Sequence, residues 1–212
     1  DFIAKHLEAL TEHSAPAHVG CILQPNERRV PRSSNYQAGK GLLEDLYFPF
    51  NSDSPAYIRN CMAGNLVVNR TAALACGGFD ENFVGAAYRF ETEFCRRLVK
   101  AEGKAFYYTP EPAIDHLKAA RGGTRQLANF LTSAKPVHSV GDYYFAMLLG
   151  SFTAASTYCV KRLMSSMTAR YYLRNPWYIP VRLLAELRGL CWAWRLRRLG
   201  PKHVKLNSPI AN

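Results

Sequence analysis

The chain has 212 residues, of which 48% are hydrophobic and 20% are charged, so it is long enough for one sizeable core with an appendage. Its six cysteines are widely spaced and form no Cys-x-x-Cys pair, which argues against a zinc site and against a small disulfide scaffold. The net charge of +11 is concentrated after residue 160, where eleven lysines and arginines accompany one glutamate. The first 160 residues are therefore nearly neutral.

Apolar periodicity predicts alternating helices and strands along the first 120 residues. We expect helices over 2–13, 70–76 and 89–101, and strands over 19–23, 63–68, 104–108 and 113–117. Gly77 and Gly103 follow two of these helices, as is typical of residues that end a helix. Residues 25–55 are polar and too long for a simple connection. The alternation predicts an α/β sheet whose ligands gather beyond the strand ends.

The tail beyond residue 140 is expected to be helical. Residues 143–160 carry no charge over 18 positions, the lower limit for a membrane-spanning helix, but their serines and threonines favour a buried or interfacial helix. Between Trp177 and Leu199 one helical stripe is apolar and another face is polar: the stripe holds Leu183, Leu187, Leu190 and Trp194, and the face holds Arg182, Glu186 and Arg197. A basic amphipathic helix with tryptophans is typical of a segment that lies on an anionic membrane.

Two glutamates open the helix expected over 89–101, and they differ in direction. The residues three, four and seven positions after Glu91 are all apolar, so Glu91 shares the inward face of the helix. Glu93 is followed by Arg96 and Arg97, an ordinary exposed ion-pair arrangement. An inward carboxylate at a helix start is a candidate general base. The alternative is a glutamate that only interacts favourably with the helix dipole.

Five motifs occur in the order found in inverting family 2 glycosyltransferases of the GT-A fold. They are Gly64–Arg70 (GNLVVNR), Gly77–Phe83 (GGFDENF), Arg89–Leu98, Tyr107–Pro110 (YYTP) and Ile114–Leu117 (IDHL). Over roughly residues 1 to 130 the chain resembles the second half of such an enzyme. The resemblance implies a partial GT-A-like, Rossmann-related mixed sheet within a domain at 1–140, followed by a helical basic tail at 141–212.

The resemblance also implies roles for particular residues. Glu91 falls where the family's catalytic aspartate lies and would be the general base, although the family usually has Glu-Asp where this chain has Phe90-Glu91. His116 matches the family's histidine after a late strand and would help to hold a metal ion or diphosphate, unless it is structural. Asn65 and Asp80 would orient acceptor or sugar hydroxyls, or else hold backbone in turns.

Basic residues complete the expected substrate-binding set. Arg89 belongs to the third motif, and Arg121 and Arg125 flank Gly122-Gly123 together with Lys118. A glycine pair between bases is consistent with a lid over a diphosphate leaving group, and equally with a solvated loop.

The family's metal- and nucleotide-binding Asp-x-Asp motif does not occur in the chain. We therefore interpret the chain as the carboxy-terminal part of a longer enzyme and expect the main ligands of a divalent cofactor, Mg²⁺ or Mn²⁺, to lie upstream of Asp1.

The expected function is transfer of a sugar, with inversion, from a nucleotide-sugar donor to a glycan or lipid-linked acceptor in polysaccharide biosynthesis. The enzyme would lie in the cytoplasm, peripheral to the inner face of the cell membrane, with an anionic membrane surface as partner. One alternative is a non-catalytic partner with a degenerate glycosyltransferase fold. The other is a basic nucleic-acid-binding protein, which the net charge suggests, but no zinc-finger or RRM motif accompanies that charge, so no nucleic acid is expected.

Overall fold

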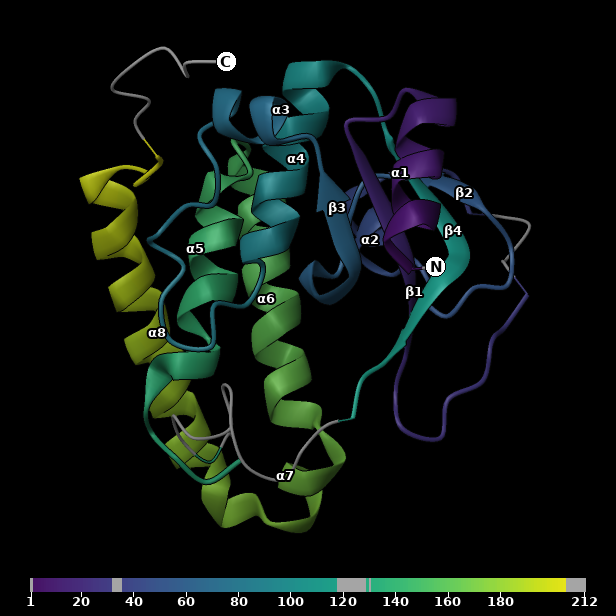
Figure 1. Cartoon of the computed structure of the whole chain (residues 1–212). Helices are drawn as coiled ribbons and strands as arrows, with labels where there is room; N and C mark the ends of the chain where they lie inside the picture. The colour runs from purple at the N-terminus through teal and green to yellow at the C-terminus, as the bar shows by residue number, and fades with distance from the viewer. Residues whose placement is uncertain (1, 32–35, 118–128, 130, 205–212) are drawn as a thin grey trace. The chain divides into compact units, whose positions relative to one another are not determined.

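The structure is a computed structural model that describes residues 2–31, 36–117, 129 and 131–204 (Figure 1). It divides into two compact units. The first comprises the described residues of Asp1–Phe79, Glu91–Ala119 and Val204–Asn212, and the second those of Asp80–Phe90 and Ala120–His203. Residues 80–90 thus group with the helical part of the chain, and the domain division expected at 140/141 stays a prediction.

An open mixed sheet of four strands forms the centre of the first unit, which confirms the α/β class. The strand order is β2 (Ala56–Ile58), β4 (Phe106–Asp115), β1 (Ala17–Leu23) and β3 (Leu66–Val68) (Figure 1). The central strands β1 and β4 are parallel, and each outer strand is antiparallel to its neighbour. The two strands expected over 104–108 and 113–117 are one strand, because the register shift after Gly20 accommodates the proline-containing segment of β4.

Helices α1 (Phe2–His13), α3 (Arg70–Ala75) and α4 (Phe90–Glu102) begin and end within a residue or so of the predicted positions. The Asn69 side chain accepts a hydrogen bond from the Ala72 amide at 3.1 Å, so α3 begins with a capped turn. Gly77 and Gly103 follow α3 and α4 with φ of 90° and 67°, the left-handed conformation that glycine adopts without strain. The polar loop contains a short helix, α2 (Leu42–Leu46), that was not predicted.

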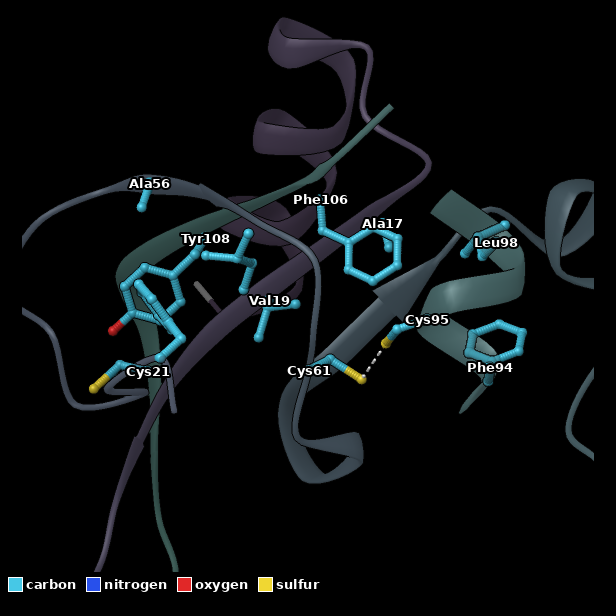
Figure 2. Close-up of a cluster of buried hydrophobic side chains, with 12 residues drawn as sticks. Ala17, Val19, Cys21, Ala56, Cys61, Phe94, Cys95, Leu98, Phe106 and Tyr108 are labelled. Atoms are coloured by element: carbon cyan, nitrogen blue, oxygen red, sulfur yellow. Dashed lines mark hydrogen bonds between the residues drawn. The ribbon is translucent and has the colours of Figure 1, made fainter. Parts of the chain in front are cut away.

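The core of the first unit lies between the sheet and α4 (Figure 2). The apolar residues of α4, Phe94, Cys95 and Leu98, are each at most 1% exposed, which confirms the predicted inward face of this helix. Cys95 lies 3.3 Å from Cys61, sulfur to sulfur, and burial raises the pKa of the Cys95 thiol. Both side chains therefore serve as small apolar groups in the core.

The second unit is a helical assembly around α5 (Val140–Leu148), whose residues from Val140 to Ala146 are all buried. Helices α6 (Phe152–Thr168) and α8 (Ile179–Leu199) both contact α5, and the short α7 (Arg170–Arg174) follows α6 (Figure 1). The uncharged stretch 143–160 is not one helix, because the chain turns at Gly150, whose φ is 77°. Among the described helices, none combines the length and the apolarity needed to cross a bilayer.

Helix α8 is oriented with charged and small side chains inward and large apolar side chains outward. Its buried residues are Arg182, Ala185, Glu186, Gly189 and Ala193. The predicted apolar stripe is exposed, with Leu187 at 52% and Trp194 at 53%. Of the predicted polar face only Arg197 is exposed, since Arg182 and Glu186 form an ion pair inside the unit.

Candidate functional site

The start of α4 is held to the preceding glycine turn by a carboxylate–guanidinium pair. Glu93 accepts two hydrogen bonds from Arg97, Nε to Oε1 at 2.6 Å and Nη2 to Oε2 at 2.8 Å. Arg97 also donates to the carbonyl oxygens of Cys76 and Gly78. The prediction of an exposed Glu93 is wrong, because only 7% of Glu93 is accessible and its pair with Arg97 fixes the turn.

Glu91 lies in the first turn of α4 and is half-buried. Burial chiefly raises the pKa of the Cys95 thiol one turn further along the helix, and the negative charge of Glu91 adds to this effect, so the carboxylate lies near that core residue. The positive end of the helix dipole favours its ionised form. A half-buried carboxylate at this position is compatible with both the base and the dipole interpretations.

Asn65 is buried at the junction of α1, β1 and β4. Its Nδ2 donates to the carbonyl oxygens of Cys21 at 2.8 Å and Pro112 at 3.2 Å, and its Oδ1 faces Nε2 of His6 at 2.9 Å. These bonds match the alternative in which Asn65 holds backbone. Its predicted role in binding substrate hydroxyls is not tested by these contacts.

A pair of buried histidines extends this network, and the sequence reasoning missed it. The Nδ1 atoms of His6 and His18 are 2.7 Å apart, and Nε2 of His18 lies 2.9 Å from Oγ1 of Thr109. Because Asn65 presents an oxygen, His6 carries its proton on Nε2, and its Nδ1 faces Nδ1 of His18. Burial and the neighbouring His6 and His13 lower the pKa of His18 to about 4. Burial also lowers the pKa of His6.

His116 follows the carboxyl end of β4 and is exposed. Its backbone amide donates to the Leu23 carbonyl at 2.8 Å, and its Nδ1 lies 3.0 Å from Oε1 of Gln24. Since β1 and β4 are parallel, Leu23 and His116 mark the edge of the sheet at which ligands bind in open α/β folds. Across the described residues, no group of three or more histidine, cysteine and acidic side chains forms a metal site.

Asp80 and Arg89 belong to the second unit. Asp80 is buried, with Oδ1 accepting from the amides of Asn82 and Lys202 at 3.0 and 2.9 Å and Oδ2 accepting from the Tyr144 hydroxyl at 2.8 Å. Both carboxylate oxygens thus bind protein groups, as the backbone-holding alternative expects.

Arg89 has a positive φ of 71° and donates from Nε to the Tyr158 hydroxyl at 2.9 Å and to Asp142 at 3.2 Å. Asp142 is in turn paired with Arg162, which reaches Glu186. Arg89 therefore belongs to a buried ionic cluster, defined here as Arg89, Asp142, Arg162, Arg182 and Glu186. The remaining predicted binding residues, Arg121 and Arg125, lie outside the described residues.

Comparisons of the chain with protein-family models, with curated proteins and with solved structures give no significant match. What the fold itself defines is the class, a mixed α/β protein with an open four-stranded sheet and a separate helical unit.

Proposed function

We propose that the chain is the carboxy-terminal part of an inverting, nucleotide-sugar-dependent glycosyltransferase with a GT-A-like fold. The observation that carries the proposal is the ordered set of five sequence motifs. The form of the first unit supports it. Parallel strands β1 and β4 end at one edge, His116 follows that edge, and α4 has two acidic residues in its first turn.

In the proposed reaction Glu91 acts as general base. Its carboxylate accepts the proton of an acceptor hydroxyl as that oxygen attacks the anomeric carbon of the donor. Attack from the face opposite the nucleoside diphosphate breaks the bond to that leaving group and inverts the anomeric centre. A divalent metal ion would neutralise the departing diphosphate, but the described residues do not form a metal site by themselves, so no step is assigned to it.

Transfer activity provides the test. The protein, produced together with whatever residues precede Asp1, is incubated with labelled nucleotide sugars and lipid or glycan acceptors. Glu91→Gln is expected to lower turnover by roughly a hundredfold or more while donor binding and folding are retained. Turnover close to wild type in this variant would remove Glu91 from the mechanism. Donor binding without transfer in the wild type would favour the non-catalytic alternative.

We further propose that the second unit places this enzyme at an anionic membrane surface, on the cytoplasmic face. Exposed apolar side chains of α8 are accompanied by the exposed Leu173 and Trp177 that precede it. Arg188, Arg195 and Arg198 are exposed on the same helix. Insertion of leucine and tryptophan side chains into the headgroup region would bury area that water now contacts, and each nearby arginine adds about 1 kcal/mol at an anionic surface.

Liposome sedimentation tests the membrane proposal. Binding is expected to require anionic lipid and to weaken as salt is added, because charge attraction is screened over a Debye length. Replacing Arg195, Arg197 and Arg198 with glutamine should release most of the protein. The control is the triple variant Arg28→Gln/Lys40→Gln/Arg70→Gln, which removes the same charge from the first unit. It should still sediment with the liposomes.

Equal sedimentation of the two triple variants, or no binding by the wild type, would contradict the membrane proposal. Tight and steeply salt-dependent retention of RNA or DNA on a filter would favour the nucleic-acid alternative instead.

A further inference from the structure

A basic pocket lies in the first unit beside α4. Its volume is about 460 Å³, and its polar lining consists chiefly of Asp45, Arg59, Asn60, Arg96 and Lys100. The volume falls within the range of small-molecule sites.

The pocket is separate from the edge of the sheet that the proposed transfer reaction would use. Ile58, the last residue of β2, pairs with Phe106, the first residue of β4. Arg59 and Asn60 therefore lie at the amino end of β4, whereas His116 lies beyond its carboxyl end. Strand β1, Ala17–Leu23, runs beside β4 over this span, so the two ends lie roughly 20 Å apart. Glu91 does not line the pocket, although its neighbour Thr92 does.

The charge of the pocket favours an anion. Arg59, Arg96 and Lys100 contribute three cations, and within the described part of the chain none of them forms an ion pair. Asp45 is the single acidic side chain of the lining, and its Oδ1 accepts a hydrogen bond from the Gly39 amide at 2.8 Å. Burial raises the pKa of Asp45, whereas the hydrogen bond from Gly39 and the nearby charges of Arg59 and Arg96 lower it.

The backbone at Gly39 lies beside the guanidinium group of Arg59. A Cβ atom at Gly39 would lie 2.5 Å from the guanidinium carbon of Arg59, so the backbone there approaches the cation closely.

Asn60 adds a second, independent requirement. It is 4% exposed, and its Oδ1 is buried with no hydrogen-bond partner among the described residues. An unsatisfied buried acceptor is uncommon and costs free energy, so a ligand that donates a hydrogen bond would be favoured at this point. Because three cations surround the space, the donor is a hydroxyl rather than an ammonium group.

We propose that this pocket binds a small hydroxylated phosphate ester of the size of a monosaccharide phosphate. The phosphate contacts Arg59, Arg96 and Lys100, and a hydroxyl donates to Asn60. The proposal does not depend on the glycosyl transfer reaction, and the pocket is a binding site rather than a catalytic one.

Calorimetric titration with three probes tests the proposal: glucose 6-phosphate, inorganic phosphate and glucose. Glucose 6-phosphate is expected to bind roughly tenfold more tightly than inorganic phosphate, because it adds a hydrogen bond at a buried acceptor, and glucose should not bind measurably. The double variant Arg59→Gln/Arg96→Gln should bind glucose 6-phosphate and inorganic phosphate at least tenfold more weakly than wild type. The control Arg28→Gln/Arg70→Gln removes the same charge elsewhere in the first unit and should change neither affinity by more than about twofold.

Asn60→Ser separates the two parts of the proposal. This variant should lose the preference for glucose 6-phosphate over inorganic phosphate while its phosphate affinity is kept. Absence of binding by the wild type, or equal weakening in the two double variants, would show an ordinary solvated basic surface and overturn the proposal. The double variants change only exposed side chains, so they remain informative even if Asn60→Ser fails to fold.

Discussion

At the scale of single residues, two glutamates only two positions apart have different environments. Glu91 is half-buried at the first turn of α4, and Glu93 is buried in a bidentate pair with Arg97. The sequence predicted the partner of Glu93 through the i,i+4 spacing but not its burial. The turn that Arg97 contacts comes from residues 76–78, and helical periodicity carries no information about that approach.

Glu93→Gln is expected to destabilise the first unit by about 2 kcal/mol, because Arg97 then keeps only part of its charge-assisted bonding. Chemical denaturation measures the effect, and Glu91→Gln is the matched control that should leave stability within about 0.5 kcal/mol of wild type. If Glu91→Gln is the more destabilising change, the two roles are assigned the wrong way round.

Acid should destabilise the protein through the buried histidine pair. Both pKa values lie below the ordinary value of 6.5, so at acid pH the unfolded chain binds more protons than the folded one. The stability contribution is complete above about pH 6.5 and decreases as the pH falls toward 4, where His18 titrates in the folded state. Thermal unfolding followed over this range should show the decrease.

His18→Gln tests this assignment. This variant removes one titrating group, so the stability of the protein should depend less on pH between 6.5 and 4, because a glutamine side chain does not titrate. An unchanged slope in this variant would assign the acid sensitivity to other groups.

At the scale of elements, helix α8 shows that a periodic sequence pattern does not by itself determine which face of a helix is buried. The two faces predicted from the sequence are present, but Arg182 and Glu186 point into the unit, where Arg162 and Ser166 also contact Glu186. Gly189 permits this close packing, because a Cβ atom there would lie 2.2 Å from Oγ of Ser139.

Glu186→Leu should destabilise the second unit by about 3–5 kcal/mol, because it leaves buried guanidinium charge without its partner. Adding Arg182→Met should recover much of that loss, since replacing both members of a buried pair with apolar groups is often nearly neutral. Urea denaturation of the single and double variants measures the difference. A double variant no more stable than the single one would show that Arg162, not Arg182, is the main partner of Glu186.

The ends of helices were predictable where a helical pattern of apolar residues was followed by a glycine. The ends of α3 and α4 coincide with glycines of positive φ, which mark the end of a helix in the sequence itself. The strand β2 was not predicted from the sequence. The continuity of β4 was missed because Pro110 and Pro112 suggest a break, whereas the register shift against β1 carries the strand past them.

At the scale of the whole molecule, the histidine pair lies in the first unit and the ionic cluster in the second. We expect two unfolding transitions in calorimetry. Lowering the pH from 6.5 to 4 should shift one of them, and Glu186→Leu should shift the other. A single transition that responds to both changes would show that the units unfold as one cooperative body.

Sequence alone determined the α/β class, the positions of α1, α3, α4 and α8, the inward direction of Phe94, Cys95 and Leu98, and the concentration of charge after residue 160. These features follow from the spacing of apolar residues along short segments and from the distribution of charged residues along the chain, both of which can be read without knowing the tertiary contacts. Only the tertiary structure decided which polar groups are buried. His6 meets Asn65, and Asp142 meets Arg162, across separations in sequence that no local pattern encodes. Burial of such groups depends on partners that the fold brings together, because an unpaired charge or polar group in a core costs several kcal/mol.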